Sequence, residues 1–149
     1  MSTKPKKPKP QLMVIGWIEH IALPDLGIPD IRCKIDTGAR TSALHADDIE
    51  RFGKDGEDWV RFGLRLKSHG PATRIEAPIY DIRRIKNTGG IPQERIVIRT
   101  TVNLGGREWP ISVSLTDRSR MKFPMIVGRS ALKNQNIAVH TRHANLTRR

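Results

Sequence analysis

The chain has 149 residues, with 27 lysines and arginines against 15 acidic residues and a formal net charge of +12. This length fits one domain of ordinary size. Three Trp, three Phe and one Tyr are few, which argues against binding single-stranded nucleic acid by base stacking. The lone cysteine, Cys33, excludes an internal disulfide and a thiolate-rich zinc site and fits a reducing, cytoplasmic location. The longest apolar run, residues 12–18, is shorter than the roughly 20 residues of a membrane helix, so we expect no membrane association.

Both ends of the chain are basic. Residues 1–10 hold four Lys, three Pro and no acid, a composition that cannot bury apolar surface. We therefore expect a disordered basic arm over residues 1–10, a folded domain over residues 11–140 and a basic tail over residues 141–149. The arm fits a solvated anchor or, alternatively, a contact with a ribosome or RNA.

Between the ends, apolar and polar residues alternate with the period of two that is typical of half-buried strands. The pattern is found in four stretches: residues 31–35, 60–66, 96–104 and 109–115. Gly105-Gly106 separates the last two and suits a tight hairpin turn. Only Asp47 to Phe52 and Ser130 to Asn136 look helical, and both are short. The sequence predicts an all-β domain of many short strands.

Two apolar strands end in residues that suit a catalytic loop. The strand over residues 31–35 runs into Asp36-Thr37-Gly38-Ala39, which places a carboxylate at a tight bend where the backbone can approach a substrate. In isolation, such a tripeptide is more often an ordinary turn. Residues 125–132 contain the second strand, which is closed by Gly128-Arg129 and leads into a short helical turn.

In this order, the two motifs resemble those of the retropepsin-like aspartic peptidases, and IKNTGGI over residues 85–91 resembles the glycine-tipped flap hairpin between them. The resemblance covers roughly residues 12–140 and is loose over residues 47–78. It implies a closed retropepsin-like barrel with a flap hairpin and one short C-terminal helix. More narrowly, KIDTGARTSALHA and MKFPMIVGRSAL are similar to the bacterial group called ATP-dependent zinc proteases. That group is associated with ATP-grasp ligases that add glutamates to a ribosomal protein.

The resemblance implies an aspartic endopeptidase. Such chemistry needs two carboxylates about 3 Å apart that share one proton. Because this chain has a single Asp-Thr-Gly, two copies of Asp36 must meet on a two-fold axis, so we expect a homodimer. The resemblance assigns the catalytic loop to Asp36, Thr37 and Gly38, substrate contacts to Ala39, Arg40, Thr88, Gly89 and Gly90, and structural support to Gly128 and Arg129.

The chain departs from the family at Arg40, because retropepsins commonly have an acid immediately after Asp-Thr-Gly-Ala. Arg40 would repel Arg129, so we expect Arg129 to pair with a carboxylate instead. The candidates are Asp47, Asp48 and Asp117. We expect Arg40 to point toward the substrate and bind acidic side chains. Alternatively, Arg40 is a solvated surface residue or a dimer contact.

The sequence gives little support to a metal or nucleotide. It has no His-Glu-x-x-His motif, and His140 and His143, three residues apart in a basic tail, fit a chance pair. No glycine-rich loop ends in Gly-Lys-Ser or Gly-Lys-Thr, so we expect no cofactor, and any ATP dependence would come from a partner such as the ligase.

The sequence therefore favours a cytoplasmic aspartic endopeptidase that acts as a homodimer on acidic or oligo-glutamate chains of a ribosomal protein. Two alternatives stay open. One is a catalytically silent dimer that binds peptides, and the other is a basic protein associated with the ribosome or nucleic acid.

Overall fold

The computed structural model describes residues 10–66, 70–86, 89–117 and 122–148. Nearly all of the predicted basic arm lies outside these ranges. The elements are β1 (Met13–Gly16), β2 (Ile18–Leu23), η1 (Pro24–Leu26), β3 (Ile28–Asp36), β4 (Ser42–His45), β5 (Asp47–Lys54), β6 (Glu57–Leu64), β7 (Thr73–Pro78), β8 (Asp81–Lys86), β9 (Pro92–Leu104), β10 (Arg107–Thr116), β11 (Met125–Gly128), α1 (Arg129–Leu132) and β12 (Ile137–His140).

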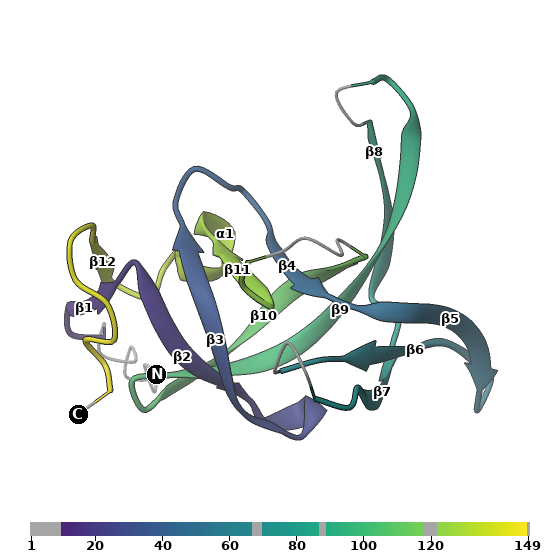
Figure 1. Ribbon diagram of the computed structural model, residues 1–149, viewed down its shortest axis with the longest axis horizontal. Helices are drawn as coiled ribbons and strands as arrows, with labels where there is room; N and C mark the ends of the chain where they lie inside the picture. The colour runs from purple at the N-terminus through teal and green to yellow at the C-terminus, as the bar shows by residue number, and fades with distance from the viewer. Residues whose placement is uncertain (1–9, 67–69, 87–88, 118–121, 149) are drawn as a thin grey trace, which may run out of the picture.

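Six of the strands form a closed barrel (Figure 1). Their order around the barrel is β10-β4-β11-β3-β2-β9, and pairing of β9 with β10 closes the ring. β11 runs parallel to β3, whereas β2 and β3 are antiparallel. The prediction of an all-β, retropepsin-like barrel with one short helix is confirmed.

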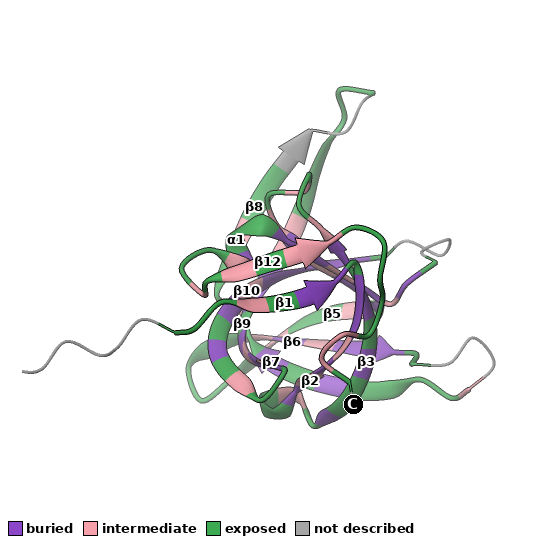
Figure 2. Cartoon of the chain, turned by 90° about the vertical axis from the view of Figure 1, so that its left-hand side faces the viewer, coloured by how far each residue is buried: buried purple, intermediate pink, exposed green. Residues whose placement is uncertain are grey.

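The core follows the alternation in the sequence. Ile31, Cys33 and Ile35 of β3 are buried, and exposed residues separate them. The strands of the barrel show the same alternation of buried and exposed segments (Figure 2). Residues at every second position of a strand face one side, so one face of each strand fills the barrel and the other meets solvent. This packing fixes the register of β3 and therefore the position of the loop that follows it.

Two hairpin turns lie where glycines in the sequence predict them. Gly105 and Gly106 have φ of 60° and 84°, and they join β9 to β10 with Leu104 opposite Arg107. Both glycines adopt the positive φ that a tight hairpin turn requires. The second hairpin, β8 and the first part of β9, rises from the barrel as an arm (Figure 1). Gly90, near its tip, has φ of 74°.

Both helical predictions need correction. Residues 47–52 form part of β5 and not a helix, because they pair with β6 and Phe52 packs against Trp59, the residue opposite it, at a ring distance of 6.4 Å. Strands β5, β6 and β7 make a separate three-stranded sheet over residues 47–78, where the resemblance is loosest. Helix α1 ends at Leu132 and does not reach residue 136, because Asn134 and Asn136 adopt positive φ. These left-handed conformations stop the helix.

The prediction for the strand over residues 60–66 is partly wrong. β6 ends at Leu64, and Leu66 is exposed. Of the described helices, none is long and apolar enough to cross a membrane.

The C-terminal residues, expected as a basic tail, lie against the barrel. The Trp17 amide donates to the His143 carbonyl over 3.1 Å, and the Asn145 amide donates to the Ile18 carbonyl over 2.8 Å. Glu19, fully buried, accepts bonds from the amides of Gly16 and Leu146 and from the Thr147 hydroxyl at 2.6, 2.9 and 2.7 Å. A buried carboxylate therefore anchors the end of the chain through hydrogen bonds.

Candidate active site

The Asp36-Thr37-Gly38 loop begins where β3 ends. The Gly38 amide donates to Asp36 Oδ1 over 3.1 Å, and the Ala39 amide donates to the Asp36 carbonyl over 3.1 Å. These bonds form a tight turn in which the aspartate side chain caps its own backbone. The carboxylate is half-buried, and Thr37 and Gly38 are exposed. The loop therefore presents one positioned acid at the surface of the barrel.

Gly128 supports this loop from the neighbouring strand. It is the partner of Asp36 in the parallel ladder between β3 and β11. A Cβ atom at Gly128 would lie 2.6 Å from the Thr41 carbonyl and 2.9 Å from the Ala39 oxygen, so only glycine fits. The Gly128 amide donates to Oγ of the buried Ser42 over 3.0 Å. Ser42 gave no signal in the sequence, because a buried serine on a short strand looks like any other polar residue.

Arg129 fixes the other side of the loop through carbonyl groups. Its amide donates to the Ala39 carbonyl over 2.9 Å, and its Nη1 donates to the Gly38 carbonyl over 3.2 Å. The next amide, of Ser130, donates to the Arg40 carbonyl over 3.1 Å. The start of α1 is thus tied to three successive residues of the loop, which makes the loop a rigid part of the barrel.

The sequence predicts a carboxylate partner for Arg129 among Asp47, Asp48 and Asp117, and this prediction is wrong. Among the described residues, no acid lies within ion-pair distance of Arg129. Asp47 instead pairs with His45 Nε2 at 3.1 Å and Arg65 Nε at 3.5 Å. A guanidinium beside a tight turn finds exposed carbonyl oxygens as acceptors, so it needs no carboxylate here.

An apolar groove of about 900 Å³ borders the loop. Its polar and cationic lining comprises Thr37, Arg40, Arg129, Ser130, Lys133 and Thr141. Its apolar lining comprises Trp17, Ile35, Leu132, Ile137 and Val139. Trp17 is 36% exposed, so this face leaves a large ring in solvent.

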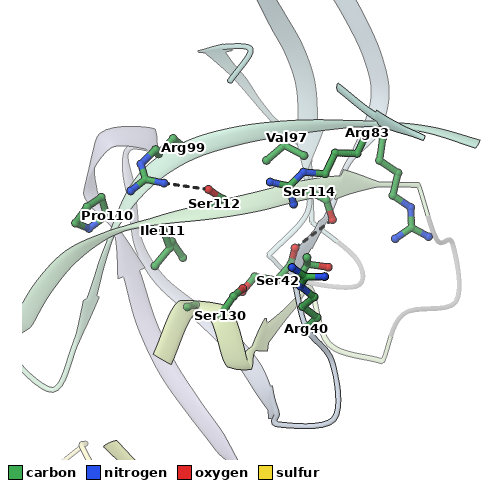
Figure 3. A pocket seen from close by; sticks show the side chains of 13 residues that line it. Arg40, Ser42, Arg83, Val97, Arg99, Pro110, Ile111, Ser112, Ser114 and Ser130 are labelled. Atoms are coloured by element: carbon green, nitrogen blue, oxygen red, sulfur yellow. Dashed lines mark hydrogen bonds between the residues drawn. The ribbon is translucent and has the colours of Figure 1, made fainter. Parts of the chain in front are cut away.

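A second cavity, of about 340 Å³, lies where β4, β8, β9, β10 and α1 meet (Figure 3). Four arginines line it: Arg40, Arg83, Arg95 and Arg99. Arg40 lines both cavities, so they meet at the residue that follows the Asp-Thr-Gly-Ala turn. The sequence carries no clear signal for the other three arginines, because alternation along β8 and β9 identifies the buried face of a strand and not the role of its opposite face.

The predicted flap residues lie on the β8–β9 arm. Gly89 and Gly90 are exposed between the two strands. Thr88 lies outside the described residues. The structure places the arm's base at the arginine-lined cavity, through Arg83 and Arg95.

Neither a thiol nor a metal has a clear place in this chemistry. Burial raises the pKa of Cys33 to about 12, so the thiol is neutral near pH 7 and is no nucleophile. Within the described ranges, one group brings three candidate metal ligands within 4.8 Å of one another, and it consists of His45, Asp47 and Asp117. Asp47 Oδ2 lies 3.5 Å from Arg65 Nε, and the group offers one imidazole and two carboxylates, unlike the cysteine- and histidine-rich sets of structural zinc sites.

The closed barrel, the Asp-Thr-Gly turn at a strand end and the Gly-Arg strand beside it define a retropepsin-like protein. The model of the RimB-like family, the retropepsin-like aspartic endopeptidase RimB, matches residues 14–148. The chain belongs to this family.

The curated relatives of this chain have a different name, and one solved structure has a similar fold. Probable alpha-L-glutamate ligases of Shewanella pealeana and Desulfotalea psychrophila are 39% identical over 126 residues and 40% identical over 127 residues. The matches cover 83% of this chain but 28% and 27% of the ligases, so the chain spans about a quarter of their length. The crystal structure of a Legionella pneumophila DUF785 protein of unknown function is 29% identical, with a TM-score of 0.75 over 91% of this chain and 98% of that chain.

Proposed function

We propose that this chain is an aspartic endopeptidase that acts as an isologous homodimer. The observation that carries the proposal is the rigid turn that presents Asp36 at the end of β3, held by Gly128 and Arg129. Two such carboxylates, about 3 Å apart across a two-fold axis, share one proton. One of them activates a water molecule, and the other protonates the carbonyl oxygen of the scissile peptide bond.

The apolar groove supports the dimer. It lies directly beside Thr37, so a two-fold axis next to the Asp36 turn brings the grooves of two protomers together. Pairing them removes Trp17 and the neighbouring aliphatic side chains from water, which favours association. The Thr37 side chains then lie close to the axis and brace the two turns.

The substrate we propose is an acidic chain, in particular an oligo-glutamate tail on a ribosomal protein. The net charge of +12 and the arginines near the turn attract and concentrate polyanions. The names of the ligases support glutamate as the residue, because a domain similar to this chain occurs within proteins named for joining it. A peptidase beside such a ligase would remove what the ligase adds.

The test is incubation of the purified protein with a poly-glutamate peptide at a series of pH values between about 4 and about 8, which records the pH dependence expected of acid–base catalysis. Asp36→Asn should abolish cleavage, and a chelator should leave it unchanged. Mass spectrometry of the products then identifies the cleaved bond. Cleavage that survives Asp36→Asn would exclude the aspartic mechanism, and loss of cleavage with the chelator alone would point to metal chemistry.

Two other results would replace the proposal. Peptide binding without any cleavage would assign the chain to the silent peptide-binding class. Tight RNA binding that weakens steeply with salt, together with no affinity for acidic peptides, would assign it to the nucleic-acid-associated class.

A further inference from the structure

The arginine-lined cavity contains an unusual pair. Arg83 of β8 and Arg95 of β9 are directly opposite each other in the antiparallel ladder. Residues directly opposite each other project from the same face of a sheet, and both of these line the cavity. Like charges in such a pair cost stability. The base of the arm therefore carries two positive charges side by side, facing Arg40 on the Asp36 turn.

Two of the arginines that line the cavity bind neighbouring side chains. Arg83 Nε lies 3.1 Å from Asp81 Oδ2, and Arg99 Nη1 donates to the neutral Ser112 hydroxyl over 3.2 Å. Of the described residues that line the cavity, none is acidic. The polar lining consists of arginines and hydroxyl groups, so the cavity offers hydrogen-bond donors and positive charge to whatever enters it.

These groups select a planar anion. The guanidinium group is a flat fork of donors that matches a carboxylate, often through two parallel hydrogen bonds. At about 340 Å³, the cavity is at the small end of ligand pockets, so it fits a side chain and not a length of polymer backbone. Figure 3 shows Arg40 and Arg83 at the cavity on different elements, with Ser42 and Ser114 between them.

The position of the cavity next to the Asp36 turn indicates which kind of molecule presents the anion. Arg40 comes directly after Ala39, the last residue of the Asp36 turn, and it lines this cavity. A peptide that lies over the turn and under the arm would therefore pass the mouth of the cavity. Its side chain near the scissile bond is the group that reaches the arginines.

We propose that Arg83 and Arg95, together with Arg40, form a carboxylate subsite that binds an acidic side chain next to the scissile bond. The inference rests on the proposed peptidase function. It assigns the preference for glutamate or aspartate to the cross-strand arginine pair at the base of the arm. A carboxylate bound by Arg83, Arg95 and Arg40 bridges the arm and the Asp36 turn.

The binding test uses the full-length Asp36→Asn protein, which holds substrate without cleaving it. A fluorescent octa-glutamate peptide is titrated against a matched peptide with glutamine at alternate positions. Arg83→Gln and Arg95→Gln should each weaken octa-glutamate binding about tenfold, as expected for a lost charge-assisted pair. Arg83→Lys, which keeps the charge but loses the fork, should fall between Arg83→Gln and the parent protein.

Arg84→Gln is the matched control. Arg84 is the next residue of β8 after Arg83, so its side chain lies on the opposite face of the strand, where Nη2 is 3.8 Å from Glu94 Oε1. Its substitution removes the same charge as Arg83→Gln. It should change binding by less than about twofold, because only long-range charge is lost. If Arg84→Gln weakens binding as much as Arg83→Gln, or neither arginine of the pair discriminates glutamate from glutamine, the subsite is excluded.

Kinetic measurements on the active protein distinguish a failure of the subsite from a failure of the proposed peptidase function. In wild type, kcat/KM should favour the acidic peptide, and Arg83→Gln or Arg95→Gln should lower that preference about tenfold, because kcat/KM falls more for the acidic peptide than for the glutamine-containing one. Wild-type cleavage with an unchanged preference in both variants overturns the subsite alone. Selective carboxylate binding without cleavage supports the subsite and overturns the peptidase. If single-stranded RNA of equal charge competes equally and weakens by the same factor in the variants, the cavity is a general polyanion site and the subsite is excluded.

Discussion

Asp36 and Gly128 face each other in the parallel ladder between β3 and β11, although they are far apart in the chain. The ladder ends at this pair, and both strands then turn. The turn after Asp36 and the start of α1 after Gly128 are linked by bonds from Arg129 to the carbonyls of Gly38 and Ala39. The position of the acid therefore depends on a close approach of two backbones.

Gly128→Ala should destabilise the protein and remove any peptidase activity. The added methyl group would lie 2.6 Å from the Thr41 carbonyl, which is backbone and cannot move aside alone. We expect a loss of about 3 kcal/mol in the free energy of unfolding, typical of severe overpacking. Urea denaturation measures this loss. Gly53→Ala is the control, since its nearest neighbour would be 4.0 Å away, and equal stability of the two variants would contradict the role of Gly128.

Much of this site follows from the sequence because the chemistry lies in short motifs at strand ends. The run from Ile31 to Ile35 sets a register, and that register decides where Asp36 emerges. The Gly105-Gly106 turn and the alternation over β9 and β10 give the adjoining wall of the barrel in the same way. These features are local, so a pattern with a period of two is enough to predict them.

Features that depend on contacts between distant segments could not be predicted. The spacing of three between Ile49 and Phe52 is typical of a helix, and β5 forms instead by pairing with β6, with an irregular register between Asp47 and Glu50. The partner of Arg129 is a carbonyl exposed by a turn, which leaves no mark in the sequence. The Arg83–Arg95 pair exists only because the arm's register places the two residues opposite each other.

Glu19 should prove important for stability, although no motif contains it. The buried carboxylate receives the amides of Gly16 and Leu146 and the hydroxyl of Thr147. Glu19→Gln replaces one acceptor oxygen by a donor, so at least one buried N–H loses its partner. We expect unfolding free energy to fall by about 1–3 kcal/mol, and Glu19→Ala to cost more.

Denaturation and limited proteolysis check this prediction. Release of the C-terminal residues should become faster in both Glu19 variants, because the anchor of the chain end is lost. The control is Glu57→Gln, a substitution at an exposed glutamate. Unchanged proteolysis of Glu19→Ala would show that the chain end is held by other contacts.

Cys33 should behave as a core residue at ordinary pH. Its thiol donates to the Glu19 carbonyl over 3.3 Å, and burial raises its pKa to about 12. A thiol reagent should therefore label the protein near pH 8 only after unfolding, and Cys33→Ala should keep any peptidase activity. Rapid labelling of the native protein would contradict the burial.

The raised pKa of Cys33 makes the free energy of unfolding depend on pH. The thiol pKa is about 12 in the folded protein and about 8.5 in the unfolded chain. Between these values the unfolded chain loses the proton that the folded protein keeps, so the contribution is complete below about pH 8.5 and is lost as pH rises. The stability of wild type relative to Cys33→Ala should fall across this range, which urea denaturation at a series of pH values measures. A constant difference would contradict the shift.

The proposed dimer predicts a particular response to mixing. If only a pair with two Asp36 carboxylates is active, adding inactive Asp36→Asn protein to wild type should lower activity more than dilution does, in proportion to the square of the wild-type fraction. Trp17→Glu places a charge in the apolar groove, so it should weaken association and make specific activity fall on dilution. Leu66→Glu, at an exposed leucine outside the groove, should do neither. Analytical ultracentrifugation gives the association state in parallel. The dimer is excluded if activity declines only linearly on mixing and the protein sediments as a monomer at the assay concentration. A single Asp36 would then act without a second copy.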